Sequence, residues 1–159
     1  MLGRSKSPFA VVVDAALEEA RRRGDRRLST EHLLLGLLHE PGAARAFGVD
    51  LATARAGLDD LDRVALRALG IEVGDLGELL DHPPAPPRHP PLRPSSITST
   101  ARDALRQAVN ATTVRTRRTA PGHLLLALLS CEPPDPAAEL IGRLDVDRAA
   151  VRERVSAAG

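Results

Sequence analysis

The sequence predicts an all-α protein in which a four-helix unit occurs twice. The chain of 159 residues has no Trp or Tyr and only two Phe, so its core must consist of Leu, Val and Ala. Leu and Ala favour helices, whereas the β-branched and aromatic residues that favour strands are scarce. The phrase HLLL-x-LL occurs at residues 32–38 and again at 123–129, which indicates two related units packed against each other.

The first two helices follow from Pro, Gly and apolar spacing. Pro8 is suited to the first turn of a helix, where its missing N–H costs nothing. Apolar residues then recur at helical spacing until Gly24 ends the helix. Thr30 is the expected N-cap of the second helix, which continues through the leucines to about Glu40 and stops at Pro41-Gly42.

Three more helices are expected in the first unit. A short helix is expected at residues 43–47, closed by Gly48. Asp50 can cap a longer helix that runs to Leu69 and ends at Gly70. A further short helix is expected at about residues 75–80.

A proline-rich connector separates the two units. The stretch HPPAPPRHPPLRPSS at residues 82–96 forbids a helix and favours an extended, polyproline-like chain. We therefore expect a first repeat at residues 1–81, a linker at 82–96 and a second repeat at 97–159, with the two repeats packed as one domain.

The helical pattern returns after the connector. The apolar residues of the first helix have counterparts 92 positions later, and His123 follows His32 by 91 positions, so the second unit has lost one loop residue. A Pro-rich turn at 132–136, a helix at about 137–144 and a last helix capped near Asp147 follow. The paired apolar residues are Phe9, Val12, Val13, Ala16 and Leu17 with Ala101, Ala104, Leu105, Ala108 and Val109.

Each leucine helix should lie at the centre of its unit, because such a leucine density means burial on most sides. Leu34, Leu37, Leu125 and Leu128 are expected to be almost wholly buried. The small residues Gly36 and Ala127 at matching positions should allow another helix to approach closely.

Composition excludes several classes of protein. With 22 basic and 21 acidic side chains the net charge is +1, which suggests no bulk attraction to nucleic acid or membrane. No apolar run approaches the length of about 18–20 residues that spans a bilayer, and the N-terminus lacks the apolar stretch of a signal peptide. The lone Cys131 fits a reducing compartment. We expect a soluble cytoplasmic protein.

No catalytic or metal-binding pattern is present in the sequence. His32 and His39 are about 10.5 Å apart along a helix, too far to share one ion, and neither H-E-x-x-H nor a Cys/His cluster occurs. His32 and His123 are therefore interpreted as structural. Cys131 lacks a His and Asn/Asp setting, and both G-x-S-x-G and a phosphate-binding loop are missing. We expect no catalytic residue, no cofactor and no metal.

Arginines cluster before each leucine helix. Arg21–Arg23, Arg26 and Arg27 have counterparts at Arg115, Arg117 and Arg118. One interpretation is a small helical DNA-binding regulator that uses arginine-flanked helical hairpins. The other is a solvated polar helix end, which the balancing acidic residues and the lack of interleaved aromatic residues favour.

The segments MLGR, EEARRRG, STEHLLLGLL and GVDL resemble the Clp N-terminal (Clp R) domain. That domain is the substrate- and adaptor-binding module of AAA+ unfoldases of the ClpA, ClpC and ClpB type, and is a pseudo-twofold pair of four-helix repeats. The chain resembles a free-standing N-domain of the actinobacterial kind. The second repeat keeps HLLLALL but lacks the residues that precede it in the family.

The resemblance implies a non-catalytic, monomeric module that binds degradation-tagged proteins, adaptors or Clp-targeting small molecules. In ClpC-type relatives the Glu of each T-E-H contacts the guanidinium of a phosphorylated arginine. Glu31 and Thr30 match that motif in the first repeat, whereas Gly122 replaces the Glu in the second. The resemblance therefore implies at most one phosphoarginine site. The implied partners are tagged proteins or peptides, a Clp unfoldase or its adaptors, and neither nucleic acid nor membrane.

Overall fold

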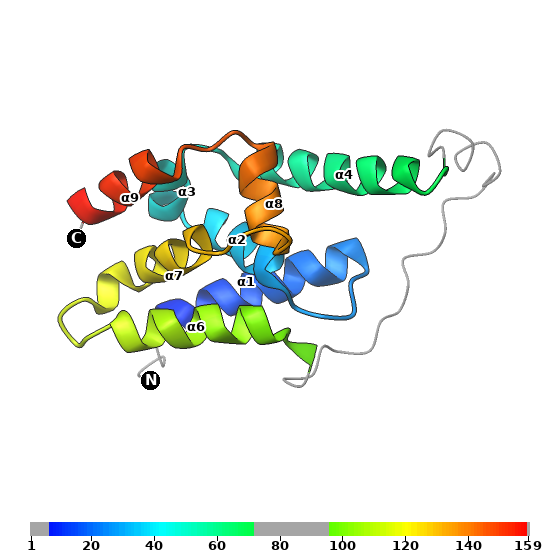
Figure 1. Cartoon of the computed structure of the whole chain (residues 1–159). Helices are drawn as coiled ribbons and strands as arrows, with labels where there is room; N and C mark the ends of the chain where they lie inside the picture. The colour runs from blue at the N-terminus through cyan, green and yellow to red at the C-terminus, as the bar shows by residue number, and fades with distance from the viewer. Residues whose placement is uncertain (1–6, 72–95, 159) are drawn as a thin grey trace.

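The computed structural model describes residues 7–71 and 96–158, and within them it is built of helices (Figure 1). The first repeat contains α1 (Pro8–Arg23), α2 (Thr30–Leu38), α3 (Pro41–Phe47) and α4 (Leu51–Ala68). The second contains α6 (Ser99–Ala111), the 3-10 turn η2 (Arg117–Thr119), α7 (Ala120–Leu129), α8 (Pro136–Arg143) and α9 (Arg148–Ala157). The all-α prediction is confirmed.

The helices of the two repeats pack in equivalent pairs. Within the repeats α1 packs on α2 and α6 packs on α7, and between them α1 meets α7 while α2 meets α6. The later helices also pack across the two repeats: α4 packs on α8, and its counterpart α9 packs on α3. Each contact thus has a counterpart when the repeats are interchanged, as the predicted pseudo-twofold duplication requires.

Two expectations fall outside the described residues. They are the short helix at 75–80 and all but the last residue of the connector at 82–96. The predicted repeat boundaries at 81 and 97 fall in or beside this stretch and stay a prediction.

The leucine-rich helices α2 and α7 contact each other and form the centre of the molecule (Figure 1). Leu34, Leu37, Leu125 and Leu128 have no exposed surface, as predicted. Gly36 also behaves as expected, because a Cβ added there would lie 2.6 Å from the Val12 carbonyl oxygen of α1. Close backbone contact between α1 and α2 therefore depends on this glycine.

Several predicted helix ends are wrong by one or two residues, including the start of α3 at Pro41 rather than at 43 and the end of α4 at Ala68 rather than Leu69. The N-cap of α2 is Ser29, and Thr30 is the first helical residue. The cause is His32, whose side chain reaches back to the Ser29 N–H and fixes the turn there. The helix ends at Leu38 rather than Glu40, because the Glu40 side chain caps α3, in which Pro41 is the first residue. Pro41 starts a helix as well as following one.

A buried carboxylate connects three helices of the first repeat. Glu19 of α1 accepts hydrogen bonds from the Arg55 guanidinium of α4, and it lies 2.7 Å from His39 Nε2 at the end of α2. Burial alone would raise the pKa of Glu19, but the hydrogen bonds from Arg55 and His39 outweigh it and the pKa is lowered. The ionised carboxylate therefore stabilises the folded state.

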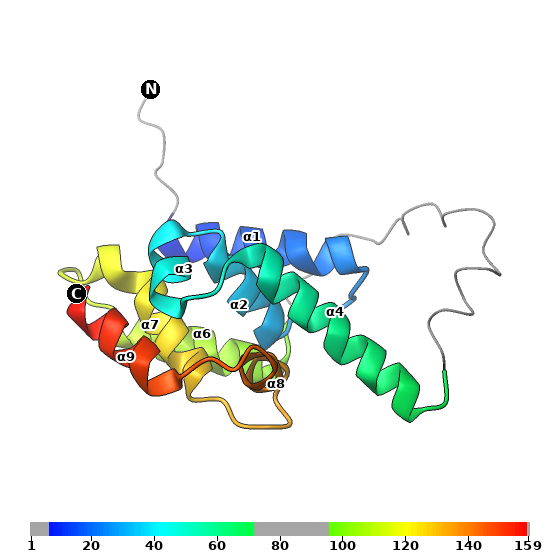
Figure 2. The same ribbon diagram turned by 90° about the horizontal axis from the view of Figure 1, so that it is seen from above.

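The outline is uneven because α4 is long. Figure 2 shows α4 extending past the other helices, and at 18 residues it is nearly twice as long as its counterpart α9, which has 10. None of the helices in the described ranges combines the length and apolar character that crossing a bilayer requires.

Candidate functional site

Glu31 lies in the first turn of α2, where the helix dipole favours a carboxylate. Its side chain is 14% exposed. The Oε2 atom is buried and has no hydrogen-bond partner among the described residues. A buried carboxylate oxygen without a partner is costly, and such an atom in a folded protein calls for an explanation such as a ligand.

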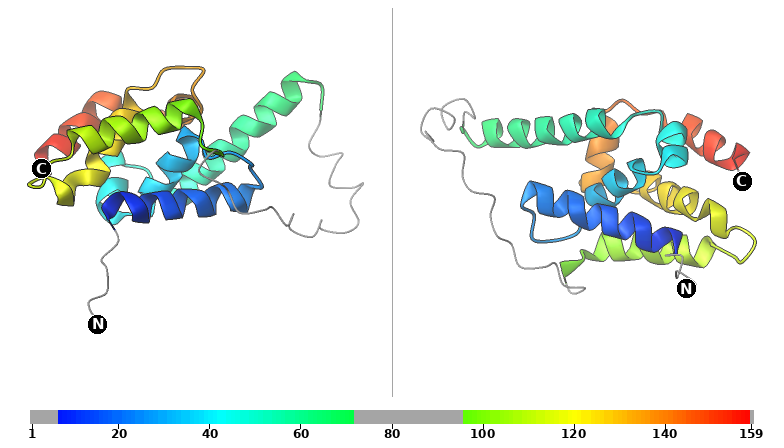
Figure 3. Two further views of the ribbon diagram at one scale, coloured as in Figure 1. Left: turned by 90° about the horizontal axis from the view of Figure 1, so that it is seen from below. Right: turned by 180° about the vertical axis from the view of Figure 1, so that it is seen from behind.

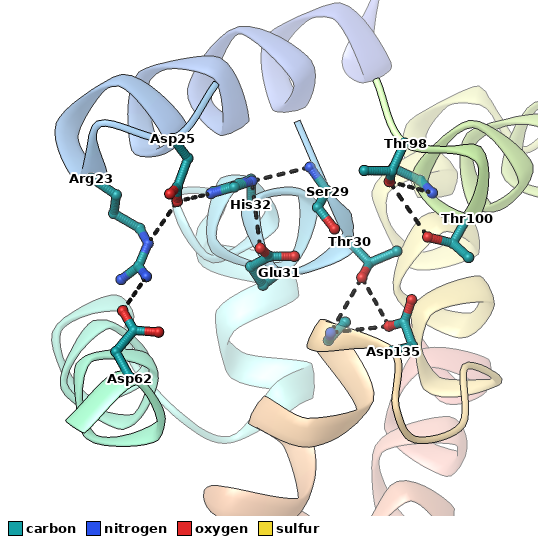
Figure 4. Close-up of polar contacts among 12 residues, drawn as sticks. Arg23, Asp25, Ser29, Thr30, Glu31, His32, Asp62, Thr98, Thr100 and Asp135 are labelled. Carbon is teal, nitrogen blue, oxygen red and sulfur yellow. Dashed lines mark hydrogen bonds and ion pairs between the residues drawn. The ribbon is translucent and has the colours of Figure 1, made fainter. Parts of the chain in front are cut away.

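His32 cannot supply the missing partner (Figure 4). Its Nδ1 accepts the backbone N–H of Ser29 at 3.1 Å, so Nδ1 carries no proton. The other ring nitrogen, Nε2, lies 2.8 Å from Asp25 Oδ2 and donates to it. The distance of 3.9 Å between Nδ1 and Glu31 Oε1 is therefore not a hydrogen bond. The histidine has the structural role predicted for it.

Thr30 has a different environment from Glu31. The residue is fully buried, and its hydroxyl donates to Asp135 Oδ1 at 2.8 Å and accepts the Ala137 N–H at 3.2 Å. It thus joins the start of α2 to the start of α8 (Figure 4). The Thr30 hydroxyl, expected at the ligand site, can meet a ligand only by giving up these contacts.

Asp135 is the partner of Thr30 that the sequence did not reveal. Its Oδ1 accepts the N–H groups of Ala137 and Ala138 as the N-cap of α8, in addition to the Thr30 hydroxyl. Its Oδ2 is the second buried oxygen without a partner in the described part of the chain. The sequence signal was an Asp before Pro136, which predicts a helix start but not a contact with a residue 105 positions away.

The start of α6 lies close to the start of α2. The Leu28 N–H donates to the Ser96 carbonyl at 2.9 Å, and the Thr98 N–H donates to the Leu28 carbonyl at 2.9 Å. Thr98 caps α6 by accepting the Ala101 N–H, and Ser99 and Thr100 of the first turn are exposed. A helix N-terminus with exposed hydroxyls and no acidic residue in its first turn favours an anion.

Arg23, from the first arginine cluster, has its charge matched by acidic groups. Its guanidinium contacts Asp25, Asp59 and Asp62 at 3.0, 3.2 and 2.6 Å. Burial would lower the pKa of Arg23, but Asp62 and Asp25 raise it. The guanidinium is therefore engaged within the protein, which argues against a DNA-binding role for this residue.

The equivalent position in the second repeat has neither the hydroxyl nor the carboxylate, and a side chain of α9 lies close to it. Gly122 replaces Glu31, Pro121 replaces Thr30, and a Cβ added at Gly122 would lie 3.1 Å from Val155 Cγ1 of α9. A cavity of about 290 Å³ beside it is lined mainly by small and apolar residues. The second repeat therefore lacks the carboxylate, and a side chain at position 122 would press against Val155.

The described residues contain no group of three His, Cys, Asp or Glu side chains placed to hold a metal ion. Burial and the nearby Asp135 raise the pKa of the Cys131 thiol to about 11, so this thiol is protonated at neutral pH and is a poor nucleophile. The described residues thus offer an unpartnered carboxylate at a helix start rather than a metal site or an activated thiol.

The comparison with protein families agrees with this description. Residues 6–75 match the sequence model of the Clp repeat (R) N-terminal domain. Residues 6–75 therefore belong to the Clp N-terminal domain family, and the resemblance seen in the sequence is confirmed for the first repeat. The family is one of non-catalytic substrate- and adaptor-binding domains, so the chain contains a protein-interaction module of the Clp system. No curated protein matches the chain in sequence.

Proposed function

We propose that the first repeat binds arginine-phosphorylated proteins, with Glu31 contacting the guanidinium of the tag. The observation that carries this proposal is the buried Oε2 of Glu31, which lacks a hydrogen-bond donor among the described residues. A guanidinium offers a planar pair of donors that matches a carboxylate, and such charge-assisted pairs are the stronger class of hydrogen bond. The ligand would thus donate the hydrogen bond that Glu31 Oε2 lacks within the described residues.

The phosphate half of the tag would lie at the start of α6. This end of the helix is connected to Leu28, three positions before Glu31, by the two backbone hydrogen bonds around Leu28. Exposed Ser99 and Thr100 add hydroxyl donors to the helix dipole. A phosphoguanidinium carries a cation-like end and an anionic end, and the two helix starts offer complementary charge to each.

The proposed module recognises its target without unfolding it. In this role it would present tagged substrates or adaptors to a Clp unfoldase in the cytoplasm, or compete with that unfoldase for them. We expect one such site per chain and a monomeric protein, since Gly122 leaves the second repeat without the carboxylate.

Affinity for an arginine-phosphorylated peptide, measured by calorimetry, tests the proposal. Glu31→Gln should lower the affinity by at least about tenfold, the effect expected when a charge-assisted pair worth 1.5–3 kcal/mol is lost. Glu139→Gln is the matched control, because Glu139 is also in the first turn of its helix but is exposed. Equal loss in both variants, or none in Glu31→Gln, would refute the role of Glu31. The unphosphorylated peptide must bind more weakly.

A further inference from the structure

A groove of about 750 Å³ lies between the start of the first repeat and the second repeat, and Glu31 is not among the residues that line it. It is bounded by the start of α1, the end of α6 and the segment that leads to α7. The loop between α6 and α7 lies at the same end of the molecule as the start of α1 (Figure 3). Three cations line it, Arg115, Arg117 and Arg118, together with the apolar residues Phe9, Val109 and Val114. We call this feature the arginine groove.

The groove exists because α6 ends early. At the positions where α1 continues through Ala20 to Arg23, the second repeat has Thr112, Thr113, Val114 and Arg115. β-Branched residues are weaker helix formers than Ala and Arg. The Thr112 hydroxyl also bonds to the Ala108 carbonyl at 2.8 Å and to His123 Nδ1 at 2.8 Å, which fixes the helix end. The chain then leaves the helix and forms one wall of the groove.

The three arginines differ from Arg23 in having no counter-charge. Their side chains are exposed, and none of them makes a hydrogen bond or an ion pair with another residue in the described ranges. No acidic residue lines the groove. Glu40 lines two neighbouring cavities together with Arg118, but its carboxylate accepts the N–H groups of Gly42 and Ala43. The positive charge is therefore available to a ligand.

Helix termini add to this positive potential. The first residues of α1 and of α7 line the groove, and neither helix has an acidic residue in its first turn. Each N-terminus contributes about half a positive charge, and the C-terminus of α6 contributes about half a negative one. The balance of dipoles therefore favours an anion in addition to the three full charges.

The apolar lining decides what kind of anion fits. Val109 and Val114 are 53% and 88% exposed, which is unusual for valine and places uncovered apolar surface beside the arginines. Nucleic acid would require a longer row of cations along its phosphates, whereas the chain as a whole carries a net charge of +1. We propose that the arginine groove binds an extended acidic peptide segment of a partner protein, with an apolar side chain between its carboxylates.

This second site is separate from Glu31, because Glu31 does not line the groove and the groove binds a ligand of the opposite charge. The two ligand sites would then differ in charge: the Glu31 site accepts a cationic group, and the arginine groove accepts an anionic segment. A partner with an acidic tail would thus be held at a place that leaves the Glu31 site open.

The test measures fluorescence anisotropy of a labelled peptide, Glu-Asp-Glu-Leu-Glu-Asp-Glu, with the full chain. The triple variant Arg115→Gln, Arg117→Gln, Arg118→Gln should bind about tenfold more weakly or worse, since each exposed charge pair contributes a few-fold. The control replaces the exposed arginines Arg22, Arg26 and Arg27 of the first repeat by Gln and should bind within about twofold of wild type. Glu31→Gln should also bind the peptide normally.

The apolar part of the proposal has its own variant. Val114→Ser should weaken the peptide with the central Leu but not the same peptide with Ser in its place. Unchanged binding by the triple variant, equal binding of the Gln/Asn version of the peptide, or no binding at all would overturn the proposal. Tighter binding of short duplex DNA that depends on the same three arginines would overturn it in favour of nucleic acid. Thermal unfolding of the triple variant should match wild type, which excludes loss of fold as the cause.

Discussion

The start of α2 and the start of α7 occupy equivalent places in the two repeats but differ in nearly every polar group. At α2, Thr30 is bonded to Asp135 and Glu31 has a buried oxygen without a partner. At α7, Pro121 and Gly122 carry no hydroxyl or carboxylate, and Val155 lies close to the position that a side chain at 122 would take. The leucines that follow are buried in both, except that Leu126 of α7 is partly buried. The comparison shows that the two repeats share a buried leucine core but differ in the polar groups at the starts of these helices.

The largest expected effect tests what the repeats share. Leu34→Ala and Leu125→Ala should each lower the free energy of unfolding by about 2–5 kcal/mol, since both side chains are fully buried. Chemical denaturation measures this. A loss under about 0.5 kcal/mol at one position would mean that the two cores are not equivalent.

The Glu19 network is a stabilising feature that the second repeat lacks, because Ala111 stands at the matching position. Glu19→Gln should lower the free energy of unfolding by about 2–4 kcal/mol at pH 7. This loss is somewhat smaller than for a fully buried pair, because Arg55 and His39 are partly exposed. Because the pKa of Glu19 is lowered by folding, its contribution is present above the ordinary value of 4.5 and is lost as the pH falls below it. As the pH falls below about 5, the free energy of unfolding should therefore decrease more in the wild type than in Glu19→Gln. Parallel pH profiles would contradict this account.

Gly36 and Ala127 test how closely helices approach in each repeat. Gly36→Ala should gain roughly 1 kcal/mol of helix propensity but lose more through overpacking, because the new Cβ meets backbone atoms of α1. We expect a net loss of about 1–2 kcal/mol in urea unfolding. Ala127→Gly is the reciprocal variant, with a loss near 1 kcal/mol from propensity. A more stable Gly36→Ala protein would show that α1 can move away.

Thr30 and Glu31 should separate stability from binding. Thr30→Val leaves Asp135 and the Ala137 N–H without the hydroxyl, so it should lower the free energy of unfolding by about 1–3 kcal/mol. Glu31→Gln removes a carboxylate whose Oε2 has no partner, so its effect on stability should stay within about 1 kcal/mol. Thermal denaturation of both variants checks this contrast, and the reverse order would make Glu31 the structural residue of the pair.

Local sequence signals predicted much of the fold. Apolar spacing, Asp50, Asp147 and the glycines Gly24 and Gly48 located helices and their ends, because caps and periodicity depend on neighbouring residues. The N-cap of α2 was misplaced by one residue because Ser29 and Thr30 are both good caps and only the His32 contact decides between them.

The site was less predictable because it depends on distant contacts. Glu31 was identified by resemblance, but the bond between Thr30 and Asp135 spans 105 positions and leaves no trace in local patterns. The arginines at 115–118 were recognised as a cluster. Their groove, however, requires α6 to end at Ala111 and the start of α1 to lie beside it, and only the packed structure determines this.

The stoichiometry of phosphoarginine binding tests the central comparison most directly. Titration of the wild-type chain, followed by backbone NMR, should saturate at one ligand per chain with shifts clustered at Glu31 and the start of α6. The NMR signal of Gly122 should not shift, and Gly122→Glu should not create a second site, because the new side chain would press against Val155 and Pro121 supplies no hydroxyl in place of Thr30. Two equivalent sites, or one site whose shifts centre on Gly122 and persist in Glu31→Ala, would contradict the account.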